Sequence, residues 1–481
     1  MVHQYRNNGY NIVLDVCSGS VHVVDDVVYD VLSGYCKAYE NVCEADEDSR
    51  CADGCSSCPK ELSASARDAL IAKCSETYPR EDVLEALEEI EELKAEGLLF
   101  AEDEYKDYII DFKKRKTVVK ALCLHIAHDC NLGCRYCFAE EGEYHGKKAL
   151  MSLEVGKKAL DFLVANSGNR RNLEVDFFGG EPTMNWDVVK ELVRYGRSLE
   201  AGYDKNFRFT LTTNGILLDD EMMEFANKEM ANVVLSIDGR KEVNDYMRPT
   251  RNGKSSYDII LPKFKKFAEL REQTNYYVRG TFTHHNLDFS KDVLHLADLG
   301  FQQISVEPVV AGPEEDYAIR EEDLKKLKQE YDALAAEMVR RHKAGEAFNF
   351  FHFMIDLNQG PCVAKRLSGC GSGTEYLAVT PWGDLYPCHQ FVGEEDYLMG
   401  NVFDGIVRTD VRDEFKLCNV YAKDKCRDCF ARFYCSGGCA ANAYKFHGNI
   451  NDTYEVGCEL ERKRVECAIM IKAALAEEKE S

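Results

Sequence analysis

The feature that most constrains the fold is a regular alternation of strand-like and helix-like segments between about residues 116 and 310. The expected strands are Val118–Ile126, Leu173–Phe178, Phe207–Thr213, Val233–Asp238, Tyr276–Thr283 and Gln303–Pro308. The helices expected between them are Leu153–Ala165, Val188–Leu199, Glu221–Met230, Tyr257–Glu272 and Lys291–Leu299. This order predicts an α/β fold with a parallel sheet or partial barrel, in which chemistry gathers at the carboxyl ends of the strands.

The first expected strand runs directly into a cysteine motif, Cys130-Asn-Leu-Gly-Cys134-Arg-Tyr-Cys137. Three thiolates on one loop can hold three irons of a [4Fe–4S] cluster and leave the fourth iron open to another ligand. The alternative is a zinc site completed by His125 or His128, because structural zinc takes four protein ligands.

The next three strands end in polar turns. These turns are Gly179-Gly180-Glu181-Pro182, Thr212-Thr213-Asn214-Gly215 and Ser236-Ile237-Asp238-Gly239. Each turn is common by itself. Because the carboxyl ends of parallel strands meet at one edge of a sheet, the three turns together indicate one site beside the cysteine loop.

From Pro361 onward the sequence is irregular and rich in cysteine and glycine. Twelve residues separate Cys370 from Gly383, and four more precede Cys388. Further cysteines follow at Cys426, Cys429, Cys435, Cys439 and Cys458. A zinc ribbon built on four of them, Cys426, Cys429, Cys435 and Cys439, is one interpretation, and iron–sulfur clusters are the other.

Composition limits the function classes. The formal net charge of −24 argues against a nucleic-acid partner, which needs a basic face. No apolar run approaches a membrane span, and the first residues lack the pattern of a signal peptide, so we expect a cytoplasmic protein. In that compartment thiols stay reduced, and the 21 cysteines therefore indicate metal or cluster ligands and buried thiols rather than disulfides.

The sequence of residues 1 to about 100 predicts a small α+β unit. Tyr10–Val16 and Ser20–Val24 form an expected hairpin, followed by helices over Asp25–Tyr35 and Glu81–Leu98. The polar stretch Cys43–Cys58 between them is expected to be a loop or a disordered insertion. Its Cys51, Cys55 and Cys58 repeat the spacing of the first motif without a preceding strand, so their role stays open.

The first cysteine motif and the three strand ends together resemble the radical S-adenosylmethionine (SAM) enzymes. The resemblance implies that Cys130, Cys134 and Cys137 hold a [4Fe–4S] cluster that cleaves SAM to methionine and a 5′-deoxyadenosyl radical. Arg248, and as a second candidate Arg279, would pair the SAM carboxylate, since a guanidinium suits it; either could equally be a scaffold arginine. The resemblance also places SAM against Gly179, Gly180, Glu181, Pro182, Thr213, Asn214, Ser236 and Asp238.

The later cysteines resemble the seven-cysteine SPASM pattern, which holds two auxiliary [4Fe–4S] clusters and brings the expected total to three. By this resemblance the first auxiliary cluster takes Cys370, Cys388 and Cys439, and the second takes Cys426, Cys429, Cys435 and Cys458. The fourth ligand of the first is open: it is either Cys362 or an iron site free for a substrate thiolate. The remaining cysteines, Cys418 among them, are interpreted as structural thiols.

Several stretches resemble the maturases of SCIFF peptides: His3-Gln4-Tyr5, Asn11–Val16, Ser18–Asp26, Arg366–Cys370 and Cys388–Gly393. The resemblance implies thioether crosslinks from cysteines to carbons of acceptor residues in a Cys-rich precursor peptide. The peptide's leader would bind a winged-helix-like N-terminal domain by strand addition, and a flavodoxin or ferredoxin would supply electrons.

The expected domains are a peptide-recognition domain (1–105), a radical SAM partial barrel (112–320), a connector helix region (321–358) and an auxiliary-cluster domain (359–470). Two rival functions stay open. One is a different SPASM enzyme, such as a sulfatase maturase that forms formylglycine. The other is a non-catalytic, zinc-binding regulatory protein.

Overall fold

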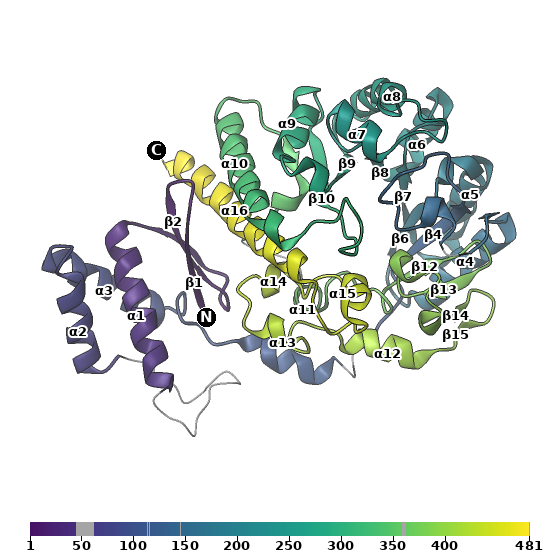
Figure 1. Ribbon diagram of the computed structural model, residues 1–481. Helices are drawn as coiled ribbons and strands as arrows, with labels where there is room; N and C mark the ends of the chain where they lie inside the picture. The colour runs from purple at the N-terminus through teal and green to yellow at the C-terminus, as the bar shows by residue number, and fades with distance from the viewer. Residues whose placement is uncertain (45–61, 113, 115, 145, 358–361, 481) are drawn as a thin grey trace.

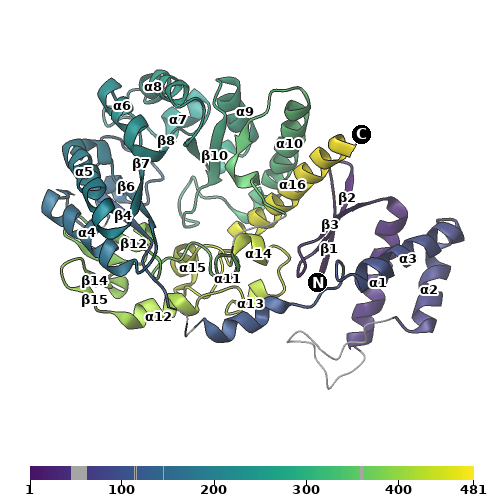
Figure 2. The same cartoon turned by 180° about the vertical axis from the view of Figure 1, so that it is seen from behind.

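A computed structural model describes residues 1–44, 62–112, 114, 116–144, 146–357 and 362–480 of the chain. An α/β partial barrel forms the largest part, and a separate N-terminal unit projects from one side (Figures 1 and 2). The predicted loop Cys43–Cys58, with Cys51, Cys55 and Cys58, lies outside the described residues except for Cys43 and Glu44, which end helix α1.

The barrel wall is one sheet in which six parallel strands follow the predicted order. The predicted α/β partial barrel is therefore confirmed, and the strand ends differ from the predicted ones by a few residues at most. The strands are β4 (Ala121–His128), β6 (Asn172–Gly179), β7 (Asn206–Thr213), β8 (Met230–Ser236), β9 (Tyr276–Phe282) and β10 (Gln303–Pro308), with short β5 (Ala149–Leu150) beside β4 and β11 (Asn349–Phe350) beside β10.

Helices lie on the outer face of this sheet, as Figure 1 shows. In α5, the buried residues Val189, Leu192, Val193 and Gly196 repeat at three- and four-residue spacing, which gives the helix one apolar face for the strands. The short helix α7 had not been predicted. The helices are α4 (Leu153–Asn166), α5 (Trp186–Tyr203), α6 (Asp220–Glu229), α7 (Lys241–Met247), α8 (Tyr257–Leu270), α9 (Ser290–Asp298) and α10 (Leu324–Lys343).

The Cys-rich C-terminal region extends the barrel sheet. Strand β12 (Tyr376–Val379) pairs in parallel with β4, with Tyr376 opposite Ala121, and β13 (Asp384–Tyr386), β14 (Gly400–Asn401) and β15 (Gly405–Ile406) continue the sheet in antiparallel fashion. The remainder includes five short helices: α11 (Val363–Ser368), α12 (Thr409–Leu417), α13 (Asp424–Arg427), α14 (Arg432–Cys435) and α15 (Ala440–His447). The region ends in the long helix α16 (Glu455–Glu480), which had not been predicted.

The N-terminal unit is a three-stranded antiparallel sheet with three helices. The predicted hairpin is confirmed as β2 (Tyr10–Asp15) and β3 (Val21–Val24), and the predicted helices correspond to α1 (Asp26–Glu44) and α3 (Arg80–Ala95). Strand β1 (Val2–Asn7) and helix α2 (Ala64–Cys74) had not been predicted. The apolar faces of the three helices share a core of their own that includes Val31, Tyr35, Leu70, Leu87 and Ile90.

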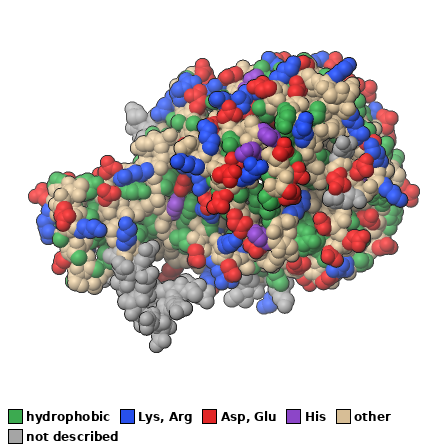
Figure 3. Space-filling view, viewed as in Figure 1, with side chains coloured by type: hydrophobic (Ala, Val, Ile, Leu, Met, Phe, Trp, Pro, Cys, Tyr) green, Lys and Arg blue, Asp and Glu red, His purple; other side chains and the backbone are tan. Residues whose placement is uncertain are grey.

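Strand β1 packs against α16 of the C-terminal region. His3 Nε2 lies 3.1 Å from Glu466 Oε1, and the Tyr5 hydroxyl donates to the Glu466 carbonyl at 3.0 Å. Acidic and basic side chains alternate over the face drawn in Figure 3. No helix of the described residues is both long and apolar enough to cross a bilayer.

Candidate functional site

The cysteine loop follows the buried strand β4, and the end of β6 runs directly against it. The Gly180 amide donates to the Ala127 carbonyl at 2.7 Å, and the Glu181 amide donates to the Asp129 carbonyl at 2.9 Å. A Cβ on Gly180 would lie only 2.1 Å from the Asp129 oxygen, and Gly179 adopts a φ of +118° that disfavours other residues. Two glycines are therefore needed for this close approach.

The Glu181 carboxylate joins the ends of β6 and β7. It accepts hydrogen bonds from the Thr213 hydroxyl at 2.8 Å and the Asn214 amide at 2.7 Å. The Asn214 side chain reaches the cysteine loop, with Nδ2 2.7 Å from Asn131 Oδ1 and 3.6 Å from Cys130 Sγ. Burial raises the pKa of Glu181 while these donors lower it. The predicted residues Cys130, Glu181, Thr213 and Asn214, which follow three different strands, thus form one network.

Asp238 and Arg248 meet at Tyr136, which lies between Cys134 and Cys137 in the motif. The Tyr136 hydroxyl donates to Asp238 at 2.8 Å and accepts from Arg248 Nη1 at 2.9 Å. Burial raises the pKa of Asp238 to about 6 and the nearby Arg248 charge opposes the rise. Both residues therefore hold the cysteine loop through Tyr136, a contact that spacing alone did not predict.

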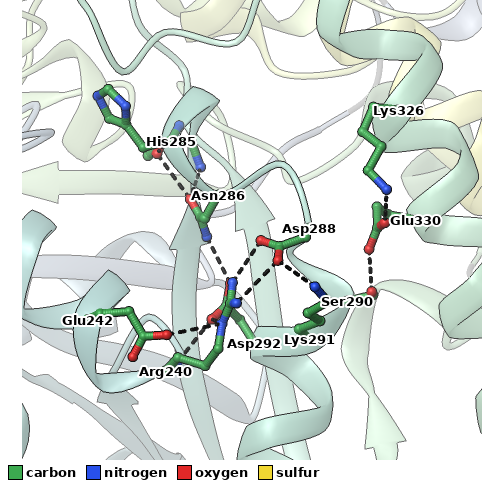
Figure 4. A network of polar contacts seen from close by, with 11 residues as sticks. Arg240, Glu242, His285, Asn286, Asp288, Ser290, Lys291, Asp292, Lys326 and Glu330 are labelled. Carbon is green, nitrogen blue, oxygen red and sulfur yellow. Dashed lines mark hydrogen bonds and ion pairs between the residues drawn. The ribbon is translucent and has the colours of Figure 1, made fainter.

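A second polar network supports the loop after β8 (Figure 4). Arg240 Nε donates to the buried Asp292 at 2.8 Å, and its Nη2 donates to Asp288 at 2.7 Å. Asn286 Nδ2 also donates to Asp292, at 3.0 Å. The network joins Arg240, two residues after Asp238, to the segment after β9 that contains Asn286, Asp288 and Asp292.

Two other predicted residues lie on neighbouring strands. Ser236 ends β8 opposite Arg279 of β9. The Arg279 guanidinium forms an ion pair with Glu307 of β10. Pro182 is buried at the start of a short 3₁₀ turn, Pro182–Asn185.

The cysteines of the motif are partly buried thiols close to charged groups. Burial raises the pKa of Cys130 to about 12, and the Glu181 carboxylate adds to the rise. Burial raises the pKa of Cys134 to about 11, and the Arg248 charge opposes it. Ionising these thiols without a metal is unfavourable, because ligation is what stabilises a buried thiolate.

The spacing of the thiols bears on the zinc alternatives. Four ligands around one zinc ion lie about 4 Å apart, given zinc–sulfur bonds of about 2.3 Å. Within the described part of the chain, the one set of three or more His, Cys, Asp or Glu ligand atoms that all lie within 4.8 Å of one another is His447, Asp452 and Glu455. The described cysteines of the motif and of the C-terminal region therefore do not have the spacing of a single zinc site.

His125 and His128 are engaged elsewhere. His125 Nδ1 lies 3.0 Å from His128 Nε2, and both rings pack against Tyr144. Burial lowers the pKa of His128 to about 4, so this pair is neutral at ordinary pH.

The residues around the motif suit a cluster with a bound organic ligand. Asn131 Nδ2 and Arg248 Nε are buried donors without a partner in the described chain. Glu181 retains acceptor capacity on Oε2, which takes the Asn214 amide alone. Thiolates for iron, unused donors for a carboxylate and an acceptor for an amino group together fit a [4Fe–4S] cluster and SAM.

The C-terminal cysteines form two groups. The thiolates of Cys439 and Cys370 add to the burial that raises the pKa of Cys388, so these three lie close together. Likewise Cys458, Cys426 and Cys429 act on Cys435, whose pKa burial raises to about 11. These groups match the two predicted ligand sets, while ligation itself stays a prediction.

Comparisons with known proteins agree with this arrangement. Residues 124–297 match the Radical SAM superfamily, and residues 370–430 match SPASM, an iron–sulfur cluster-binding domain. The radical SAM cyclopropyl synthase TigE of Paramaledivibacter caminithermalis is 22% identical over 370 residues, covering 71% of this chain and 72% of that protein. The cysteine-type anaerobic sulfatase-maturating enzyme of Clostridium novyi is 23% identical over 347 residues, covering 69% of this chain and 90% of that protein.

Among solved structures, anSMEcpe with bound AdoMet has the same fold, with a TM-score of 0.60 and 20% sequence identity. The match covers 73% of this chain and 96% of that chain. The chain therefore carries a radical SAM domain and a SPASM domain, and about a quarter of it has no counterpart in that structure.

Proposed function

We propose that this chain, which carries a radical SAM domain and a SPASM domain, is an enzyme that installs thioether crosslinks in a Cys-rich, ribosomally made precursor peptide. The observation that carries the proposal is the open edge of the N-terminal sheet. Strand β3 pairs with β2 on one side and with no strand of the described chain on the other. An extended leader peptide can add to such an edge through backbone hydrogen bonds.

The two edges of this sheet differ in a way that supports the proposal. Strand β1 lies against α16 through His3 and Tyr5, so it is not free to take a peptide. Strand β3 has half-buried and exposed residues, and the Val23 side chain is 42% exposed. Docking of a leader at β3 would hold the rest of the peptide near the barrel at a high effective concentration.

The chain's own residues have separable tasks in the proposed reaction. Cys130, Cys134 and Cys137 would hold the cluster, and Asn214 and Glu181 connect the cysteine loop to the strand ends beside it. When bound, SAM and the reduced cluster supply a 5′-deoxyadenosyl radical, which removes a hydrogen atom from an acceptor carbon.

The C-terminal groups complete the proposed set of three [4Fe–4S] clusters. Cys370, Cys388 and Cys439 hold the first auxiliary cluster beside the barrel, and Cys426, Cys429, Cys435 and Cys458 hold the second. A flavodoxin or ferredoxin is the proposed electron donor, and the cytoplasm is the proposed location.

A second function is favoured by the curated relatives, several of which are anaerobic sulfatase-maturating enzymes. Such an enzyme would modify a cysteine or serine side chain without a crosslink. The N-terminal unit argues for the first function, because its open β3 edge offers a peptide-binding site that modification of a single side chain does not require.

The test is anaerobic reconstitution, followed by iron and sulfide analysis and incubation with SAM, reductant and a Cys-rich precursor peptide. We expect about twelve irons per chain, formation of 5′-deoxyadenosine, and a loss of about two daltons for each crosslink in the peptide. Change in a sulfatase-derived peptide alone would favour the second function. Zinc in place of iron, or no SAM cleavage, would refute both.

A further inference from the structure

One lysine of the C-terminal region is buried without a negatively charged partner. Lys423 is only 2% exposed. Its Nζ donates to the Asp452 carbonyl at 3.0 Å and forms no ion pair with any residue that the structure describes. An ammonium group has three donors, so two of them remain unused. Because burial of an unpaired charge is strongly unfavourable, a negative charge that the polypeptide does not supply is needed near Lys423.

The carboxylates close to Lys423 in the loop are engaged with other cations. Asp452 Oδ1 lies 3.9 Å from Lys425 Nζ, and Asp424 Oδ1 lies 3.5 Å from Arg427 Nη2. The side chains of Lys425 and Arg427 are 58% and 47% exposed, so water also solvates their charges. Lys423 has neither a carboxylate nor water to offset its charge.

Lys423 lines a cavity beside the first auxiliary group. Cys370 lines the same cavity, and so does the segment Ser436–Gly438 that leads to Cys439. Lys416 adds a second cation to the lining, and no aspartate or glutamate of the described chain takes part in it. The whole chain has 84 acidic and 60 basic side chains, so a cavity lined by cations alone is exceptional in it. Such a cavity suits a negatively charged occupant.

The same lysine is also fixed to the second auxiliary group. The Lys423 carbonyl accepts from the Cys426 amide at 2.9 Å. The Lys423 Cδ lies 3.7 Å from the position that a Cβ on Gly437 would take, and Gly437 lies midway between Cys435 and Cys439 in sequence. Since Cys435 belongs to the second predicted ligand set and Cys439 to the first, the lysine lies where the two sets meet.

We propose that the Lys423 ammonium is the buried counter-charge of the auxiliary [4Fe–4S] clusters and raises their reduction potentials. The inference rests on the proposed function in one respect, namely that the two cysteine groups hold clusters. Thiolate ligands give such a cluster a net negative charge, which grows by one when the cluster takes up an electron. A fixed positive charge therefore favours the reduced form. The electron comes from the reductant, and no bond forms or breaks in this step.

The test measures reduction potentials in the full-length chain with Cys130, Cys134 and Cys137 replaced by alanine, so that the auxiliary clusters alone give electron paramagnetic resonance signals. The protein is reconstituted anaerobically and titrated with dithionite. Lys423→Met removes the buried charge at similar side-chain length, and Lys423→Arg keeps it. Lys425→Met is the matched control, since it removes an exposed charge from the same loop.

We expect Lys423→Met to lower the potential of at least one auxiliary cluster. At a fixed potential its reduced-to-oxidised ratio should fall by at least about tenfold, which is about 59 mV for one electron. Lys423→Arg and Lys425→Met should change it far less, because arginine keeps the charge and water screens an exposed one. Unchanged potentials in Lys423→Met at about eight irons per chain, or an equal fall in Lys425→Met, would overturn the inference.

Iron content separates this inference from the proposed function. If Lys423→Met takes up only about four irons, Lys423→Gln, whose amide can still donate to the Asp452 carbonyl, is titrated in its place and judged by the same shift. Loss of a cluster from both neutral variants, with retention in Lys423→Arg, would report the same need for positive charge through cluster assembly. Loss from Lys423→Arg as well would overturn the inference. About four irons or fewer in the parent would instead refute an auxiliary cluster and that part of the proposed function.

Discussion

At the residue scale, Tyr136 connects the cysteine loop to the barrel. Its hydroxyl satisfies the buried carboxylate of Asp238 and one nitrogen of Arg248. All three side chains are largely withdrawn from water, so the hydroxyl cannot be replaced by solvent without rearrangement. The position of Cys134 and Cys137 therefore depends on one phenol group between them.

Replacement of Tyr136 by phenylalanine removes this hydroxyl and leaves both partners buried with one bond fewer. We expect a loss of about 1–3 kcal/mol in the free energy of unfolding and weaker SAM binding to the reconstituted protein. Urea unfolding and isothermal titration measure the two effects. Tyr195→Phe is the control, since its hydroxyl donates to Asp161 at 2.7 Å between helices α4 and α5, far from the loop in sequence. Equal effects of the two changes would contradict the special role of Tyr136.

Asp176 gives a pH-dependent prediction. Burial raises its pKa from 3.8 to about 6. Between these two pH values the folded protein therefore keeps a proton on Asp176 that the unfolded chain has already lost. The contribution of protonated Asp176 to the free energy of unfolding is complete below about pH 4 and is lost as the pH rises through about 6. The total change in the free energy of unfolding is up to about 3 kcal/mol. Asp176→Asn cannot carry this charge. It should be more stable than the wild type by up to about 3 kcal/mol at about pH 8, and by about half of that at about pH 5, as read from urea unfolding at both values. A constant difference between the two proteins would refute the assignment.

The sequence predicted which residues share the site, and the reason is physical. Asn214 and Glu181 follow parallel strands, whose carboxyl ends must meet at one edge. The direction of each side chain does not follow from spacing. The resemblance assigned Glu181 and Asp238 to SAM, which stays a prediction, and the structure adds their bonds to Asn214 and Tyr136, which spacing does not give.

At the scale of elements, the ends of β4 and β6 are joined through backbone atoms. Gly180→Ala would place a Cβ 2.1 Å from the Asp129 oxygen, and the strand ends must then separate. We expect the iron content of the reconstituted protein to fall by about four atoms per chain, since the displaced loop carries the radical SAM cysteines. Gly202→Ala is the control: it lies in α5 with open space around its Cβ, and alanine there favours the helix. Full iron content in Gly180→Ala would show that the close approach is dispensable.

Strands with strong periodicity were predictable, and those defined by distant partners were not. Strand β12 has four residues and is recognisable as part of the barrel sheet only because it pairs with β4, more than two hundred positions earlier. Helix α16 was missed because its apolar residues do not form one stripe. It packs on α10 on one side and on β1 on another, so its pattern reflects several neighbours.

At the scale of the whole molecule, the N-terminal unit docks where the second auxiliary group lies. Phe430, directly after Cys429, stacks on His3 of β1 with ring centroids 3.5 Å apart. Arg432 is 4% exposed and pairs with Asp103 at 3.0 Å, just beyond the N-terminal unit. Phe430 and Arg432, which help Glu466 of α16 to hold the unit in place, are thus carried by the loop of Cys426, Cys429 and Cys435.

This arrangement predicts that the second auxiliary cluster positions the N-terminal unit. Its loop has only short helices of four residues, α13 and α14, so ligation of the proposed cluster would supply much of its order. Replacement of Cys426 and Cys429 by serine should therefore release Phe430 and Arg432 and speed amide exchange in β1 by at least about tenfold, equivalent to about 1.4 kcal/mol of lost protection.

Hydrogen–deuterium exchange measured by mass spectrometry follows β1 directly, and β7 inside the barrel is the internal control. If β1 keeps its protection while about four irons are lost, docking of the unit does not depend on the cluster. If β1 and β7 lose protection together, the variant has unfolded more widely, and the single change Phe430→Ala, which leaves all cysteines in place, then decides whether the stacking contact itself protects β1.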